Sequence, residues 1–167
     1  FKNFKNQSIS LLEIGSFHGN AAASFFFYFD KAKIYSGDIF PDLFRYKSKR
    51  IFSFYVNSSD EISIKNNILN NNLQFEIIIE DASHCLKDQI ISLFMLFKSL
   101  KSKGIFIIEE LDFPDTRDDM NLNKEKTTLK KILNCIINNK DFYSKYISKE
   151  EKEYFLHNYE SIDIYKG

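Results

Sequence analysis

The residues best suited to chemistry follow a short apolar segment in the middle of the chain. Residues 75–79 are followed by Glu80 and Asp81 and, after two small residues, by His84. Carboxylates bind metal ions or move protons, and a histidine, with a reference pKa of about 6.5, can remove a proton at neutral pH. This spacing of residue types therefore indicates a catalytic or metal-binding site.

A second apolar segment ends in the same way, because residues 104–108 are followed directly by Glu109 and Glu110. Both segments are rich in isoleucine and show no strict alternation, which is typical of strands buried on both faces of a parallel sheet. Ligands of open α/β sheets bind in the crevice outside the carboxyl ends of the strands. We therefore expect these carboxylates and the histidine to converge at one edge of a sheet.

A glycine loop precedes these segments in the chain. Residues 9–14 predict a strand, Gly15 and Gly19 lie in the loop after it, and residues 21–29 predict a helix. Strand, glycine loop and helix form the first half of a nucleoside-binding unit, although a lone match of this kind is equally consistent with a tight turn. Asp38 ends the next expected strand, about 23 residues beyond Gly15, near the roughly 20-residue spacing at which an acid reaches ribose hydroxyls. Together these features favour a nucleoside ligand.

The elements that must position these residues alternate between strand and helix. Strands are expected at 9–14, 33–36, 51–56, 75–79, 104–108 and 161–165, and helices at 21–29, 60–70, 86–100, 124–139 and 148–157. Ser148 and Glu151 fit a capping box for the last helix. Residues 112–123 are polar and aperiodic, so we expect a loop over the site. This order predicts a doubly wound, mostly parallel α/β sheet with helices on both faces, a Rossmann-like fold.

Length and composition are those of a single globular domain spanning residues 1–167, with 44% hydrophobic and 28% charged residues. The net charge of +0 gives no reason to expect a nucleic acid or an anionic membrane as partner. Cys85 and Cys135 show no metal-ligand spacing and no disulfide framework, which favours a reducing cytoplasm. The chain begins at Phe1 without an initiator methionine and stops just after an expected strand, so we expect both ends to be cut from a longer protein.

The motifs together resemble a known family. The chain has Leu-Leu-Glu-Ile-Gly-Ser-Phe-His-Gly at 11–19, Ser-Gly-Asp-Ile at 36–39, Glu-Asp-Ala-Ser-His at 80–84 and Gly-Ile-Phe-Ile-Ile-Glu-Glu-Leu at 104–111. This set resembles the class I S-adenosylmethionine-dependent methyltransferases. More narrowly, it resembles the metal-dependent sugar O-methyltransferases of the mycinamicin and macrocin type and their cephalosporin-hydroxylase-like relatives.

The resemblance implies a methyltransferase that acts on a sugar or polyol hydroxyl of a small molecule or glycan. It implies that S-adenosylmethionine is bound by Glu13, Gly15, Ser16, Gly19, Asp38 and Asp81. It further implies that His84 is the general base and that Asp81, also catalytic, binds Mg²⁺ or Mn²⁺ together with Glu109 and Glu110. The family usually has Glu-Asp at the last two positions, so Glu110 would be a ligand one methylene longer.

Other interpretations remain open at this point. Glu80 is expected to cap a helix or to face water, as glutamates usually do. The glycine loop and Asp38 alone would also suit an oxidoreductase that binds NAD or a nucleotide sugar, although the chain has no Tyr-x-x-x-Lys pattern. A methyltransferase-like fold kept as a non-catalytic binding module is a third possibility. The acceptor is not readable from the sequence, and a homo-oligomer is left open.

Overall fold

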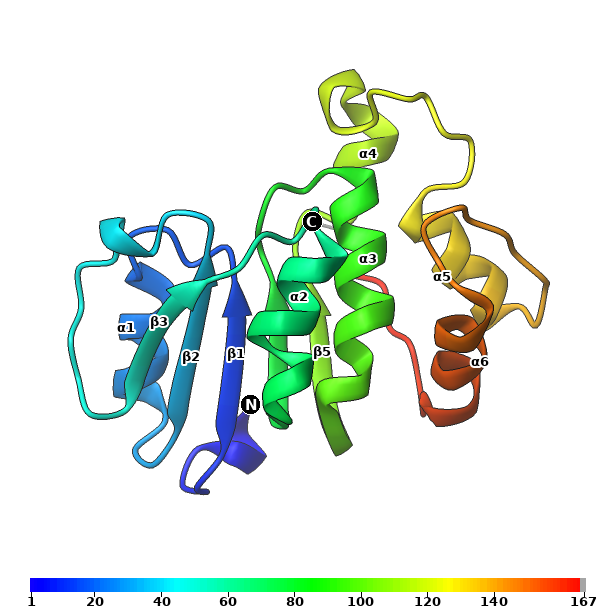
Figure 1. The fold of residues 1–167 in the computed structure, drawn as a ribbon. Helices are drawn as coiled ribbons and strands as arrows, with labels where there is room; N and C mark the ends of the chain where they lie inside the picture. The colour runs from blue at the N-terminus through cyan, green and yellow to red at the C-terminus, as the bar shows by residue number, and fades with distance from the viewer. Residues whose placement is uncertain (166–167) are drawn as a thin grey trace.

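The structure, a computed structural model, describes residues 1–165 and is built on one parallel sheet (Figure 1). The five strands lie in the order β3-β2-β1-β4-β5, and all neighbouring pairs are parallel. Their bounds are β1 Ser10–Ile14, β2 Lys33–Asp38, β3 Ile51–Tyr55, β4 Phe75–Glu80 and β5 Leu100–Ile108. The predicted doubly wound α/β fold is confirmed.

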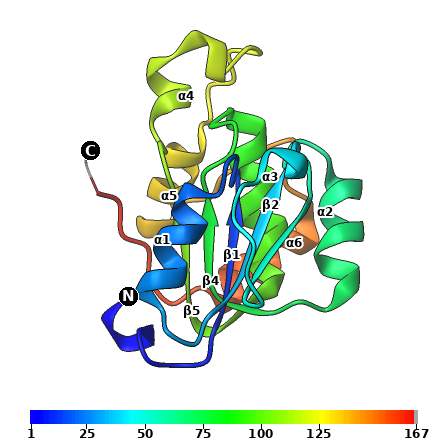
Figure 2. The same cartoon turned by 90° about the vertical axis from the view of Figure 1, so that its left-hand side faces the viewer.

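Helices cover both faces of this sheet, as Figure 2 shows edge-on. The α-helices are α1 Asn20–Tyr28, α2 Glu61–Asn67, α3 Leu86–Leu96, α4 Phe113–Thr116, α5 Leu129–Ile137 and α6 Lys149–Asn158. Helix α1 packs on one face, where Ala22 and Phe29 join the strand residues Leu11 and Ile77 in one core cluster. Helices α2 and α3 pack on the other face.

Helix α3 is the best-buried helix near the crevice. Every residue of α3 except Lys87 is buried. One side of the helix joins the core cluster on the sheet through Ile91 and Met95. The other side packs against α5 and α6 through Ile90 and Phe94. Because it is packed on both sides, α3 is a rigid support for the segments at either end of it.

Helix ends agree with the capping signals in the sequence. The Asp60 carboxylate accepts a hydrogen bond from the backbone N–H of Ile62 at the start of α2. Ser148 and Glu151 form the expected reciprocal capping box at the start of α6. Each cap satisfies backbone groups that have no partner within the helix, and so fixes where the helix begins.

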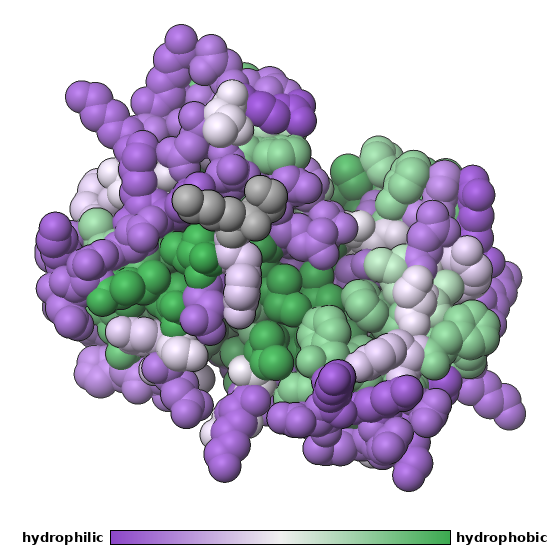
Figure 3. Space-filling view, turned by 180° about the vertical axis from the view of Figure 1, so that it is seen from behind, coloured by the Kyte–Doolittle hydropathy of each residue, from purple (hydrophilic) through white to green (hydrophobic). Residues whose placement is uncertain are grey.

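The face of the sheet opposite α3 carries apolar side chains at its surface. Figure 3 shows them gathered near the centre of this side of the molecule. Ile105 of β5 is 38% exposed, and Ile107, which points the same way along the strand, is only partly buried. Helix α1 therefore covers this face over β1 and β2 more completely than over β5.

Three expectations about the second half of the chain are wrong. Residues 161–165 form no strand, because Ile162 and Ile164 pack instead against the helical cluster of α3, α5 and α6. Residues 112–123 are not simply a loop, since they contain α4 and a 3₁₀ turn at Asp118–Met120. Helix α5 begins at Leu129 rather than near residue 124. No helix among residues 1–165 is long and apolar enough to cross a membrane.

Candidate functional site

The carboxyl ends of β1, β2, β4 and β5 bring the sequence-predicted site residues to one edge of the sheet. In the sheet register, Ile14 of β1 lies between Gly37 of β2 and Glu80 of β4. The chain runs outward from β1 through β2 to β3 and then crosses to β4 on the other side of β1, and this reversal places a crevice beside the end of β1. Glu13, Asp38, Asp81 and Glu109 lie close enough around this point for their charges to act on Glu13.

Gly15 is required by the loop that follows β4. Its φ is +94°, and a Cβ atom there would lie 2.1 Å from the carbonyl oxygen of Asp81. Gly19 has a φ of +82°, and a Cβ there would lie 2.4 Å from the ring of Phe44. Both positions therefore need glycine, in the first case because the loops after β1 and β4 touch.

Asp38 organises the backbone around the glycine loop. Its carboxylate accepts hydrogen bonds from the backbone N–H groups of Phe17, at 2.7 Å, and Phe40, at 2.8 Å. The Ser16 hydroxyl donates to the carbonyl oxygen of Gly37 at 3.3 Å. Each carboxylate oxygen of Asp38 keeps further acceptor capacity, so this arrangement leaves it able to accept from a ligand hydroxyl.

Two buried glutamates lie beneath the crevice. Burial, and secondarily the neighbouring Asp81, raises the pKa of Glu13 to about 7. Burial raises the pKa of Glu80 to about 8, and the charge of Asp88 acts in the same direction. Glu80 is fully buried, so the expectation that it faces water or caps a helix is wrong. Both groups hold a proton far more readily than an ordinary glutamate does.

His84 and Asp81 lie side by side in the loop after β4. His84 Nε2 is 3.7 Å from Asp81 Oδ1. Burial raises the pKa of Asp81, while His84 acts to lower it and Glu110 to raise it. Burial also raises the pKa of Glu109, and the charges of Asp81 and Glu110 add to the effect. The carboxylates after β4 and β5 are therefore close enough to repel one another.

Several buried polar atoms at the crevice have no hydrogen-bond partner. Six buried side-chain atoms have no partner among the residues that the structure describes, and three of them, Glu13 Oε2, Glu80 Oε2 and His84 Nδ1, belong to acids and the histidine at the strand ends. Buried polar atoms are nearly always paired in folded proteins, so three such atoms at one place indicate a site that is completed from outside the chain.

Three of the seven non-glycine residues with positive φ in the described part of the chain lie at the same edge. Phe17, His84 and Glu110 have φ values of +42°, +58° and +49°, in the left-handed region that non-glycine residues seldom adopt. They follow β1, β4 and β5, respectively. Each such residue costs on the order of 1–3 kcal/mol and persists only where its surroundings hold it. Strain of this kind gathers at functional sites.

The segment after β5 lies against this site. The ring of Phe113 in α4 meets the ring of His84 edge-on, with the centroids 5.4 Å apart. Met120 Sδ lies 3.8 Å from the sulfur of Cys85, the residue after His84. The expectation that residues 112–123 lie over the site agrees with these contacts.

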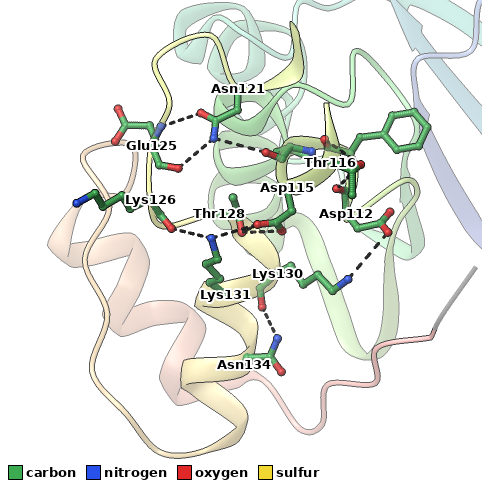
Figure 4. Close-up of polar contacts among 12 residues, drawn as sticks. Asp112, Asp115, Thr116, Asn121, Glu125, Lys126, Thr128, Lys130, Lys131 and Asn134 are labelled. Atoms are coloured by element: carbon green, nitrogen blue, oxygen red, sulfur yellow. Dashed lines mark hydrogen bonds and ion pairs between the residues drawn. The ribbon is translucent and has the colours of Figure 1, made fainter. Parts of the chain in front are cut away.

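Polar contacts fasten the same segment to helix α5 (Figure 4). The Asp115 carboxylate accepts from the Thr128 hydroxyl and pairs with Lys131 at 3.2 Å. Lys130 Nζ lies 4.0 Å from Asp112 Oδ2. An open pocket of about 280 Å³ beside these ion pairs is lined by none of the predicted site residues.

The residues predicted as metal ligands suit a divalent cation by type. Carboxylate oxygens are the donors that Mg²⁺ and Mn²⁺ prefer, and mutually repelling carboxylates beside orphaned oxygens would be stabilised by such a charge. Within residues 1–165, no three His, Cys, Asp or Glu side chains are already gathered as a ligand set. Glu109 and Glu110 are exposed, which leaves their side chains free to turn toward Asp81.

Two polar residues near the site, Asp88 and Gln89, were not recognised in the sequence. They lie in the first turn of α3 and are 5% and 0% exposed. Their side chains are buried against the loops at the strand ends, where Asp88 bonds to Ser59 and Ser83 and Gln89 bonds to the backbone after β5. The sequence contained no signal that would have distinguished them from surface residues.

No protein-family model matches the sequence, and no curated protein matches it. The fold is similar to that of several solved structures. The MycE methyltransferase of the mycinamycin pathway, in complex with Mg, SAH and mycinamycin VI, aligns over 83% of this chain and 38% of its own, with TM-score 0.71 and 21% identity. The chain thus spans well under half the length of MycE.

Two other structures share the fold more distantly. The fibrillarin pre-rRNA processing protein of Methanococcus jannaschii aligns over 72% of this chain and 54% of its own, with TM-score 0.54 and 18% identity. A short chain dehydrogenase family protein of Francisella tularensis aligns over 75% of this chain and 57% of its own, with TM-score 0.50 and 13% identity. The shared feature is a Rossmann-like α/β fold.

The buried glutamates predict that stability falls as pH rises. Glu13 and Glu80 have folded pKa values near 7 and 8 against ordinary values of 4.5, so the folded chain binds more protons than the unfolded chain between about pH 4.5 and 8. Their contribution is present below this window and is lost through it, on the order of several kcal/mol in total. Denaturant unfolding between pH 5 and 8 in EDTA measures this loss.

A neutral substitution at Glu80 isolates its share of the effect. Glu80→Gln should flatten the decline between pH 5 and 8, whereas Glu160→Gln, at an exposed position, should leave the decline unchanged. An identical pH dependence in wild type and Glu80→Gln would show that Glu80 does not carry the buried proton.

Proposed function

We propose that the chain is the cofactor-binding part of an S-adenosylmethionine-dependent O-methyltransferase. The observation that carries the proposal is the set of carboxylates and one histidine at the carboxyl edge of the sheet, beside a glycine loop and short of hydrogen-bond partners. The fold it shares with MycE, which binds SAH, supports the choice of cofactor. The cofactor would supply the methyl group, and the chain would hold and align it.

The ends of β1 and β2 would bind the cofactor. Gly15, Ser16 and Gly19 shape the loop that would face it, and Glu13 lies beneath that loop. Asp38, already held by two backbone N–H groups, would accept the ribose hydroxyls with its remaining lone pairs. Because the carboxylate is fixed before the ligand arrives, little side-chain ordering would be lost on binding.

His84 would act as the general base. Its Nδ1 atom is buried without a hydrogen-bond partner, and Asp81 lies beside its Nε2 atom, where a negative charge would stabilise the protonated ring. Phe113 covers one edge of the ring and would keep water from that side. The acceptor hydroxyl would lose its proton to His84 as it takes up the methyl group. In-line alignment of the two reactants can supply roughly 7–11 kcal/mol of the barrier.

Asp81, Glu109 and Glu110 would hold Mg²⁺ or Mn²⁺. When bound, the ion would lower the pKa of an acceptor hydroxyl and so ease its deprotonation. The complex of MycE with Mg and mycinamycin VI supports a sugar or polyol hydroxyl as acceptor, on a small molecule or glycan.

Competing functions have weaker support. The dehydrogenase of similar fold aligns at a TM-score of 0.50, against 0.71 for MycE, and the chain lacks the Tyr-x-x-x-Lys pattern. A binding module without activity would have no need of a histidine held in a strained conformation beside an acid. The absence of nucleic-acid partners and a cytoplasmic location remain predictions, the former because a pre-rRNA processing protein shares the fold.

Cofactor affinity should depend on Asp38. Asp38→Ala removes the carboxylate that would hold the ribose and also frees the Phe17 and Phe40 N–H groups, so binding of S-adenosylhomocysteine should weaken by about 1.5–3 kcal/mol. Calorimetry of Asp38→Ala against Asp30→Ala, at an exposed position, measures the difference. Equal affinity for S-adenosylhomocysteine in the two variants would show that Asp38 does not bind the nucleoside.

Metal binding and proton transfer should be separable. Asp81→Ala should abolish metal-dependent turnover and leave cofactor affinity nearly intact, because the nucleoside would be held by β1 and β2. His84→Ala should keep metal and cofactor but lose about 10²–10⁴-fold in rate, with recovery at high pH. Asp42→Ala, at an exposed position, is the control for turnover and for Mn²⁺ binding. Turnover that is insensitive to both EDTA and the loss of Asp81 would contradict the metal assignment.

A further inference from the structure

The first turn of helix α3 contacts both loops that carry the candidate catalytic acids. Asp88 and Gln89 are the third and fourth residues of the helix, and both side chains are buried although both are polar. They point to different strands. Asp88 reaches the loop after β4, and Gln89 reaches the loop after β5.

The carboxylate of Asp88 holds the backbone next to His84. Its Oδ2 atom accepts hydrogen bonds from the hydroxyl of Ser83, at 2.5 Å, and from the hydroxyl of Ser59, at 2.7 Å. The Ser83 oxygen in turn accepts from the backbone N–H of Cys85 at 3.1 Å. The residues on either side of His84 are therefore tied to one carboxylate, and His84 itself lies between them at a φ of +58°.

Gln89 holds the other acid-bearing loop. Its Nε2 atom donates to the carbonyl oxygens of Glu110, at 3.1 Å, and Glu109, at 3.4 Å. Glu110, like His84, has a left-handed backbone, with a φ of +49°. A single amide group therefore fixes the backbone at both carboxylates that follow β5.

A purely structural explanation accounts for only part of this arrangement. An acid in the first turn of a helix is favoured by the helix dipole, which explains a negative charge at Asp88. It does not explain why Asp88 and the adjacent Gln89 are buried and hydrogen-bonded to two different loops, at the two positions of non-glycine strain after β4 and β5. Burying two polar side chains is costly unless each gains a specific partner.

We infer that Asp88 and Gln89 are positioning residues, which use the rigid helix α3 to set the distance between the Asp81–His84 loop and the Glu109–Glu110 loop. The inference rests on the proposed function, since it gives these loops a shared task. Asp88 sets the direction of His84 through Ser83 and Cys85, and Gln89 sets the direction of the two glutamates through their carbonyl groups. Neither residue needs to touch a ligand.

The test substitutes each group without changing its size greatly. Gln89→Met removes the amide and keeps the length of the side chain, and Asp88→Asn keeps one acceptor oxygen where Asp88→Ala keeps none. Gln74→Met is the control for loss of an amide-to-carbonyl hydrogen bond, because the exposed Gln74 also donates to a backbone carbonyl, that of Lys98, but lies just before β4 at the opposite edge of the sheet.

Three quantities should be measured for each variant: affinity for S-adenosylhomocysteine, affinity for Mn²⁺, and amide hydrogen exchange in the two loops. Gln89→Met should speed exchange at residues 109–112, and Asp88→Ala at 82–86, each at least tenfold, with exchange at residues 15–19 unchanged. Both variants should keep cofactor affinity within twofold and bind Mn²⁺ at least tenfold more weakly. Asp88→Asn should lose much less Mn²⁺ affinity than Asp88→Ala does, and Gln74→Met should lose no Mn²⁺ affinity.

The outcomes separate this inference from the function on which it rests. If wild type binds both ligands and Gln89→Met and Asp88→Ala bind Mn²⁺ as tightly as wild type, the positioning role is wrong and the proposed function stands. If the variants lose Mn²⁺ and cofactor affinity together with thermal stability, the residues are merely structural. If wild type binds neither ligand, the proposed function fails and the positioning role fails with it.

Discussion

The contact between the loops after β1 and β4 is the constraint on which the rest of the site depends. Gly15 has a left-handed backbone conformation, and the carbonyl oxygen of Asp81 occupies the space that any side chain at residue 15 would need. The Asp81 N–H donates to the carbonyl oxygen of Ile14 at 2.9 Å, so the two loops are also joined by the backbone. The proposed cofactor loop and the proposed catalytic loop are therefore held in one arrangement by van der Waals contact and a hydrogen bond.

This arrangement gathers acidic side chains at one edge of the sheet, with Glu13 and Glu80 buried and Glu109 and Glu110 exposed. Glu13 and Glu80 are buried with raised pKa values, and Asp81 and Glu109 are raised in the same direction. Such a group of acids destabilises the free chain, and the apolar packing of α3 offsets the cost. Repulsion between these acids is relieved when a cation or a proton donor binds. The site therefore lowers the stability of the ligand-free chain in favour of ligand binding, which is a common trade-off between stability and function.

Much of the architecture was predictable from the sequence because its signals are local. Isoleucine-rich strands, the glycine loop and the Ser148 capping box each express a short-range preference, and the order of elements then specifies a parallel sheet. The site residues followed from the rule that ligands bind at the carboxyl ends of strands. Residues 161–165 show the alternating pattern of a strand, with apolar side chains at Ile162 and Ile164. In the structure these two side chains pack against helices. The burial of Glu80, Asp88 and Gln89 arises from contacts between distant segments, which no local pattern records.

The most direct test of the account is calorimetric titration of the wild-type chain with S-adenosylhomocysteine and, separately, with NAD, each with and without Mg²⁺. S-adenosylhomocysteine is expected to bind at one site per chain without requiring Mg²⁺, and NAD is expected not to bind. Binding of NAD in place of S-adenosylhomocysteine, or of neither nucleoside, would contradict the assignment of this crevice to a methyltransferase cofactor.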